Sequence, residues 1–260
     1  MQLFRIPKVQ LALALFLITL TTLIQFPLFF VAKIFVFSVL FTVGTELLFL
    51  YLRKHMVFVP YAAIVTGLIL ALTIDPRLPW YGILLISVIA TGAKHFIRFS
   101  DRHVFNPAAI GLVAGSLLLQ STVSWWGVSF QIFTQTPVHT ISFLILLLPF
   151  LVSGMRMRRF GSIGAFLFTY SVLLYILNNG SPYQIITDPT VLFFAIVMLP
   201  EPMTSPVVLQ RQIFYGGFIA IAAVMFSYLP FSRSLFAAHV IPDGLLPFLL
   251  IGNLLFFKLR

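Results

Sequence analysis

Two short apolar segments bounded by prolines constrain the fold of this chain more than any other feature. One follows Pro60 and ends at Asp75-Pro76, and the other lies between Asp188-Pro189 and Glu201-Pro202. Each is shorter than the roughly 20 residues that a helix needs to cross the hydrocarbon core of a bilayer. The two lie about half of the 260-residue chain apart. Interrupted segments in matching places indicate a membrane protein built from two repeats, with a binding site between them.

The composition is that of a polytopic membrane protein. Hydrophobic residues make up 60% of the chain and charged residues only 8%, whereas about a quarter is typical of a soluble domain. The absence of cysteine excludes disulfides, thiolate nucleophiles and cysteine-ligated metal centres. Apolar runs predict ten membrane segments, at about 9–27, 32–52, 60–74, 80–97, 107–119, 138–154, 161–178, 189–200, 209–229 and 242–257.

The distribution of basic residues predicts the orientation. With the N-terminus in the cytoplasm, the ten segments place only Lys33, Arg77 and Arg233 of the 16 basic residues outside. This asymmetry follows the positive-inside rule and puts both termini in the cytoplasm of a cell (inner or plasma) membrane protein. The net charge of +10 therefore reports topology, with some attraction to anionic membrane lipid, and does not indicate nucleic-acid binding.

Ten segments divide into two halves of five, which we expect at residues 1–130 and 131–260. Because five is odd, the two halves must face opposite ways, so the repeat is predicted to be inverted. The predicted fold is thus one all-α membrane domain, formed by two inverted five-helix repeats whose third and eighth helices are broken.

Three acidic residues lie at or near predicted membrane depth, where a carboxylate needs a partner or a role. Asp75 and Glu201 follow the short third and eighth segments, where they either line a shared polar pocket or cap the chain at the aqueous rim. Glu46 lies within the second segment. It either takes part in proton or cation movement or is satisfied by Asn or Thr on a neighbouring helix.

Basic residues gather around the end of the fourth segment and the start of the fifth, in AKHFIRFSDRHVFNPAAIG. They predict either an anion site near a helix N-terminus or ordinary cytoplasmic charge. Asn106 is expected to cap the fifth helix, and Gly111 and Gly115 are spaced for close helix packing. The following loop, Gln120–Pro137, contains Trp125 and is expected to be a re-entrant or a surface segment.

The segments HVFNPAAIGLV and MLPEPMTSPVV, with TGLILAL in the first short segment, resemble a known family. They are similar to the RnfD/NqrB family, which comprises membrane subunits of Rnf-type ferredoxin:NAD oxidoreductases and of the sodium-pumping NADH:quinone oxidoreductase. That family has ten membrane helices in two inverted repeats. Its members open the fifth helix with Asn-Pro-Ala and carry Asp-Pro and Thr-Ser-Pro after the eighth, where this chain has Glu201 in place of the aspartate.

This resemblance implies a flavin, either riboflavin or FMN, bound within the helix bundle. The family attaches FMN to the threonine of a Ser-Gly-Ala-Thr motif, which this chain lacks, so non-covalent binding is expected. The residues predicted to bind the cofactor are Lys94, Asn106, Pro107, Asp188, Glu201, Thr204 and Ser205.

Two functions remain open from the sequence. One is a flavin-binding component of an electron-transport complex, which passes electrons across or along the membrane and is coupled to ion movement. Its partners would be other subunits of a membrane redox complex or a soluble flavoprotein or ferredoxin-type reductase. The other is a solute transporter or channel without flavin, because inverted repeats with broken helices also build transporters. There, a pocket between Asp75 and Glu201 would hold the solute.

Overall fold

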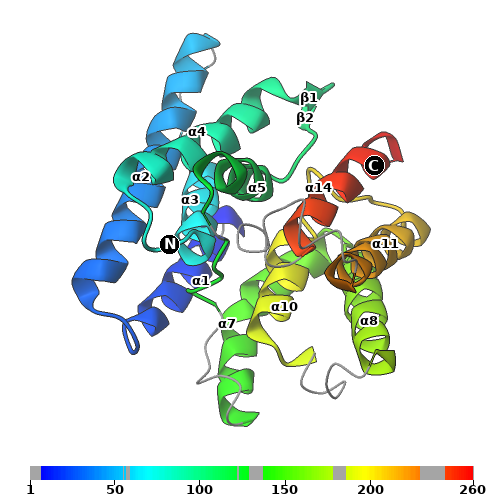
Figure 1. The fold of residues 1–260 in the computed structure, drawn as a ribbon. Helices are drawn as coiled ribbons and strands as arrows, with labels where there is room; N and C mark the ends of the chain where they lie inside the picture. The colour runs from blue at the N-terminus through cyan, green and yellow to red at the C-terminus, as the bar shows by residue number, and fades with distance from the viewer. Residues whose placement is uncertain are drawn as a thin grey trace.

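The computed structural model describes residues 7–54, 56, 59–121, 123–128, 137–177, 186–228 and 244–259. These residues form an all-α structure with one short antiparallel hairpin, β1 (Arg98–Phe99) and β2 (Arg102–His103) (Figure 1). Each of the ten predicted segments overlaps a helix, and residues 178, 229, 242 and 243 of these segments lie outside the described residues. The helices are α1 (Pro7–Thr22), α2 (Leu28–Leu52), α3 (Tyr61–Thr73), α4 (Trp80–Phe96), α5 (Pro107–Leu119), α7 (Pro137–Arg156), α8 (Phe160–Ile176), α10 (Pro189–Phe193) continued by the π-helix η2 (Phe194–Met198), α11 (Leu209–Tyr228), and α14 (Leu245–Phe256) continued by the 3₁₀-helix η3 (Phe257–Leu259).

Prolines fix where several of these helices begin. Proline lacks an N–H group, and the first turn of a helix does not need one, so helices tolerate it there. Helix α3 starts directly after Pro60, while α5 and α10 start at Pro107 and Pro189. The preceding Asn106 and Asp188 accept hydrogen bonds from free amides of the first turn. The predicted cap at Asn106 is therefore confirmed.

The exterior carries many large apolar side chains, among them Phe29, Leu118 and Phe168, which are 85%, 67% and 72% exposed. Soluble monomers rarely expose large contiguous apolar patches. In the part of the chain that the structure describes, α2 and α11 have the length and apolar composition needed to cross a bilayer. An exterior of this kind suits contact with lipid.

The two short segments, α3 and α10 with η2, lie largely in the interior. Residues 68–73 of α3 are buried, and so is every residue from Val191 to Leu199 in α10 and η2. Figure 1 shows α3 beside α2, α4 and α5, and α10 beside α7. Because neither segment is long enough to span a bilayer, their burial lets protein groups rather than lipid meet the backbone at their ends.

The segment 123–128 satisfies backbone carbonyls at the end of α3. The indole nitrogen of Trp126 donates to the carbonyl of Ala71 at 2.9 Å, and the amide of Gly127 donates to that of Leu72 at 2.9 Å. Trp126 is only 8% exposed. Of the two sequence alternatives for this loop, the surface one is wrong for these residues, because they are inserted among the helices.

Close helix packing explains the glycine pair of α5. A Cβ atom at Gly111 would lie 2.8 Å from the Cβ of Ala90 and 2.8 Å from the carbonyl of Ile86, both in α4. One at Gly115 would overlap the Ile86 side chain. The packing interpretation of this spacing is therefore confirmed.

Candidate functional site

The two sequence motifs, Asn-Pro-Ala and Glu-Pro-x-Thr-Ser-Pro, meet in space although they lie almost 100 residues apart in the chain. Asn106 connects them. Its Oδ1 accepts from the amide of Ala109 at 3.1 Å, which caps α5, and its Nδ2 donates to the carbonyl of Met198 at 3.1 Å, at the end of η2. The Asn106 side chain is 4% exposed, and both its oxygen and its nitrogen thus form hydrogen bonds.

The turn that follows η2 is closed around Glu201. The Thr204 hydroxyl donates to Glu201 Oε2 at 3.1 Å, and the Ser205 hydroxyl donates to the Glu201 carbonyl at 2.7 Å. His103, at the end of β2, places its Nε2 atom 2.9 Å from Glu201 Oε1. Thr204 and Ser205 are completely buried. The carboxylate thereby ties the β1–β2 hairpin to the turn.

Arg159, directly before α8, completes this region, which we call the motif junction (His103, Asn106, Pro107, Arg159, Glu201, Thr204 and Ser205). Its Nη2 donates to the carbonyl of Pro202 at 3.0 Å, and the side chain is 4% exposed. Nε and Nη1 have no hydrogen-bond partner among the described residues. Burial, with a smaller contribution from Arg102, lowers the pKa of the Arg159 guanidinium. The sequence did not single out Arg159 among the basic residues of its loop.

The motif junction contains five of the seven residues predicted to bind a cofactor, and the other two lie elsewhere. Asp188 Oδ1 accepts from the amides of Thr190 and Val191 at 2.8 and 3.0 Å. Asp188 therefore caps the start of α10, whereas Glu201 follows the end of η2. The ten helical residues between them, Pro189 to Met198, span about 15 Å at 1.5 Å per residue. Lys94 lies against Glu46, in a separate cluster.

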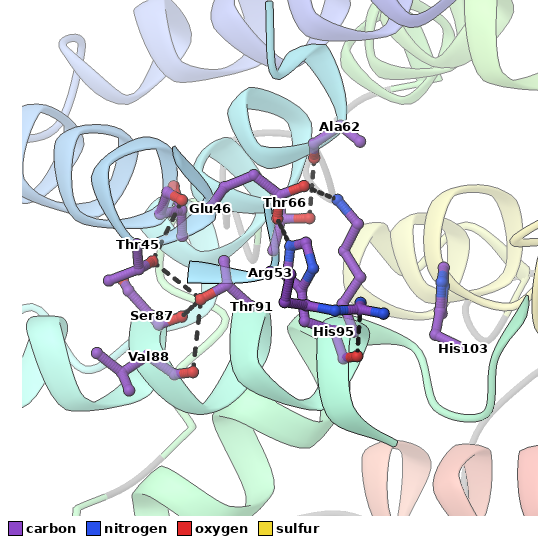
Figure 2. Close-up of polar contacts among 12 residues, drawn as sticks. Thr45, Glu46, Arg53, Ala62, Thr66, Ser87, Val88, Thr91, His95 and His103 are labelled. Carbon is purple, nitrogen blue, oxygen red and sulfur yellow. Dashed lines mark hydrogen bonds and ion pairs between the residues drawn. The ribbon is translucent and has the colours of Figure 1, made fainter. Parts of the chain in front are cut away.

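That second group, the Glu46 cluster (Glu46, Lys94 and His95), is buried between α2 and α4. The Lys94 ammonium forms an ion pair and hydrogen bond with Glu46 Oε1, and Glu46 is only 2% exposed. His95 Nε2 lies 3.1 Å from Glu46 Oε2, but the two atoms are not aligned as a hydrogen bond. The Glu46 carboxylate faces the His95 ring, and His103 stands apart (Figure 2). Among the described residues the partners of Glu46 are Lys94 and His95, so the alternative in which a neighbouring Asn or Thr satisfies it is wrong.

Neighbouring groups hold the Glu46 cluster in place. Arg53 donates to the carbonyl of His95 at 2.9 Å, which pins the end of α4 to the end of α2. The hydroxyl of Thr91 on α4 donates to that of Thr45 on α2 at 2.9 Å, one residue before Glu46 (Figure 2). The two helices thus share one polar layer.

Asp75 and Glu201 form different hydrogen bonds. Asp75 Oδ1 accepts from the amide of Arg77 at 2.9 Å in a partly exposed turn. Glu201 is engaged by His103 and Thr204. The polar pocket between the two carboxylates stays a prediction.

Comparison with known proteins identifies relatives of this chain. Residues 5–152, more than half of the chain, match the model of the NQR2, RnfD, RnfE family. A protein of Klebsiella pneumoniae (strain 342), named as the D subunit of an ion-translocating oxidoreductase complex, is 32% identical over 101 residues, which cover 37% of this chain and 29% of that protein. Proteins of the same name from Salmonella paratyphi A are 34% identical over 100 residues, covering 35% of this chain and 27% of each. The chain thus matches less than a third of the length of these relatives.

Proposed function

Because the chain belongs to the NQR2, RnfD, RnfE family, we propose that it is a membrane component of an ion-translocating oxidoreductase complex. The named relatives are subunits of such complexes. Its partners are then other subunits of the complex, with a soluble flavoprotein or ferredoxin-type reductase as the electron donor or acceptor. The basic residues at the motif junction would lie on the cytoplasmic side, with both termini.

We further propose ten membrane segments in two inverted repeats. The helix contacts support this arrangement, because they recur in the two halves. In the first half α4 packs against both α2 and α5, and in the second half α11 packs against both α8 and α14. Helix α1 contacts α7 and α5 contacts α14, so equivalent helices also meet across the halves. The short buried α3 and α10–η2 segments occupy matching places in the chain.

The cofactor that we propose is non-covalent riboflavin or FMN near the motif junction. A flavin ring needs apolar walls, and the buried segment before the junction is lined by rings. Phe194 lies 5.1 Å from Phe166, and Phe193 lies 6.5 Å from Trp125, between ring centroids. The hydroxyls of Thr204 and Ser205 are already used within the turn, so they would shape the site rather than bind the flavin directly. The Arg159 donors that have no partner among the described residues suit a polar or anionic part of the cofactor.

When bound, a flavin supplies one- and two-electron transfer, and the protein supplies position and electrostatics. In this chain Asn106 and Glu201 hold α5, the hairpin and the turn after η2 together. The joining of both sequence motifs at one junction is the observation that carries the redox proposal.

A visible spectrum of the protein purified in mild detergent tests the flavin. We expect a flavin absorption band, which is lowered in the double variant Thr204→Val/Ser205→Val because the turn around Glu201 loses both hydroxyl contacts. Thr66→Val is the control, since the hydrogen bond of the Thr66 hydroxyl in the described part of the chain stays within α3, to the carbonyl of Ala62 at 3.0 Å. A colourless wild-type protein that does not bind added flavin would falsify the cofactor proposal. The intact mass should show no attached FMN.

A further inference from the structure

We propose that Arg159 forms a buried oxyanion site at the motif junction, and that its ligand is a phosphate group. A guanidinium carries five N–H donors and a charge that it keeps at neutral pH. Here one nitrogen donates to the Pro202 carbonyl, and Nε and Nη1 are buried with no partner among the described residues. A buried cation without a counter-ion is strongly disfavoured, so this arrangement calls for an anion.

No acidic side chain that the structure describes supplies that anion. Each of the five described acids has another place in the fold: Glu46 pairs with Lys94, Asp75 and Asp188 accept backbone amides, Glu201 pairs with His103, and Asp101 is exposed. The cation is therefore not neutralised by these residues.

The sixth acid, Asp243, lies outside the described residues. Among the residues that the structure describes, no ion pair joins Arg159 to an acid, and its Nε and Nη1 have no partner. An external anion is therefore the counter-ion of this proposal.

Phosphate fits this site because the positive charge has more than one source. Arg102 is close enough to act electrostatically on Arg159. Arg159 also stands at the N-terminus of the 17-residue helix α8, where the helix dipole favours negative charge. A phosphate group carries more charge and more acceptor oxygens than a carboxylate, and it binds guanidinium groups well. The group can belong to a phospholipid headgroup or to a soluble phosphate ester, including FMN.

Thermal unfolding in detergent tests the site with inorganic phosphate as the probe. At matched ionic strength, phosphate should raise the melting temperature of the wild type above its value in chloride. Arg159→Gln should lose this increase, while Arg156→Gln should keep it, because Arg156 is an exposed residue of the preceding helix. If Arg159→Gln does not fold, Arg159→Lys keeps a charge with fewer donors and should show a reduced increase.

Extraction of the purified proteins distinguishes the sources of the phosphate. If a ligand is retained, wild type and Arg156→Gln should release a phospholipid or a flavin nucleotide that Arg159→Gln has lost, and mass spectrometry identifies which. A colourless protein that still shows the Arg159-dependent effects would remove the flavin and leave this site standing. Equal phosphate responses in wild type and Arg159→Gln, or no response together with no retained phosphate compound, would overturn the proposal.

Discussion

The Glu46 cluster and the motif junction bury charge in different settings. The Glu46 cluster joins neighbouring helices of the first half, and its ion pair links residues 48 positions apart. The motif junction joins the two halves, and its carboxylate and imidazole come from residues 98 positions apart. In the first region an acid has two basic neighbours, whereas in the second a buried cation, Arg159, has no acid among the described residues.

The comparison distinguishes a buried charge that is paired within the protein from a buried charge that a ligand would neutralise. A buried ion pair that is closed within the chain fixes how two helices pack, and it adds little to stability compared with an apolar pair of the same size. An uncompensated buried charge is tolerated when a ligand completes it, because the ligand's binding energy then offsets desolvation. The Glu46 cluster fits the first description, and Arg159 fits the second.

Removing the Glu46 carboxylate should have the largest effect on stability. Glu46→Gln leaves the Lys94 charge without its partner between α2 and α4, which costs about 3 kcal/mol for a buried pair. Thermal or denaturant unfolding in detergent measures the loss. Glu46→Gln/Lys94→Gln should recover a large part of it, and Asp101→Asn, at an exposed position, should have no effect. If the single variant is as stable as the wild type, the cluster is not closed as described.

Asn106 should contribute more to the free energy of unfolding than Asp188, although both side chains cap a short helix. Asn106→Ala removes the cap of α5 and also leaves the buried Met198 carbonyl without its donor, which together cost about 2–3 kcal/mol. Asp188→Ala removes a cap alone and should cost about 1 kcal/mol. Equal losses in unfolding experiments would mean that the Met198 bond does not join the two halves.

Much of this architecture could be predicted from the sequence, because it depends on local chemistry. Prolines and apolar runs mark the helices, and Asn106 before Pro107 indicates a cap. The polar contacts between helices depend on side-chain geometry that no spacing encodes. Lys94 is an example: the sequence predicts that it binds the cofactor, whereas in the structure its ammonium forms an ion pair with Glu46. Arg156 and Arg159 look alike in the sequence, yet only Arg159 is buried.

The second half offers a matched pair of glycines that tests its helix packing. A Cβ atom at Gly216 of α11 would overlap the Ser162 carbonyl of α8, whereas one at Gly217 would lie 3.8 Å from the nearest atom, Thr169 Oγ1. Gly216→Ala should destabilise by about 1–3 kcal/mol through overpacking. Gly217→Ala should stabilise by about 0.5–1 kcal/mol, as alanine does in helices. Unfolding of both variants shows whether α8 and α11 are as close as α4 and α5.

The smallest expected effect is the coupling between His103 and Glu201, whose side chains are 8% and 20% exposed. Their contact closes the motif junction, but partial exposure of the carboxylate weakens it through solvent screening. A double-mutant cycle with His103→Gln and Glu201→Gln should give a coupling energy of about 1 kcal/mol. The same cycle with His103→Gln and Asp188→Asn should give a value near zero, since Asp188 caps α10 at its far end. Coupling energies of equal size in both cycles would mean that the variants rearrange the protein in general, and that the His103–Glu201 contact contributes nothing specific. The motif junction would then lack the link between the two halves of the chain that distinguishes it from the Glu46 cluster.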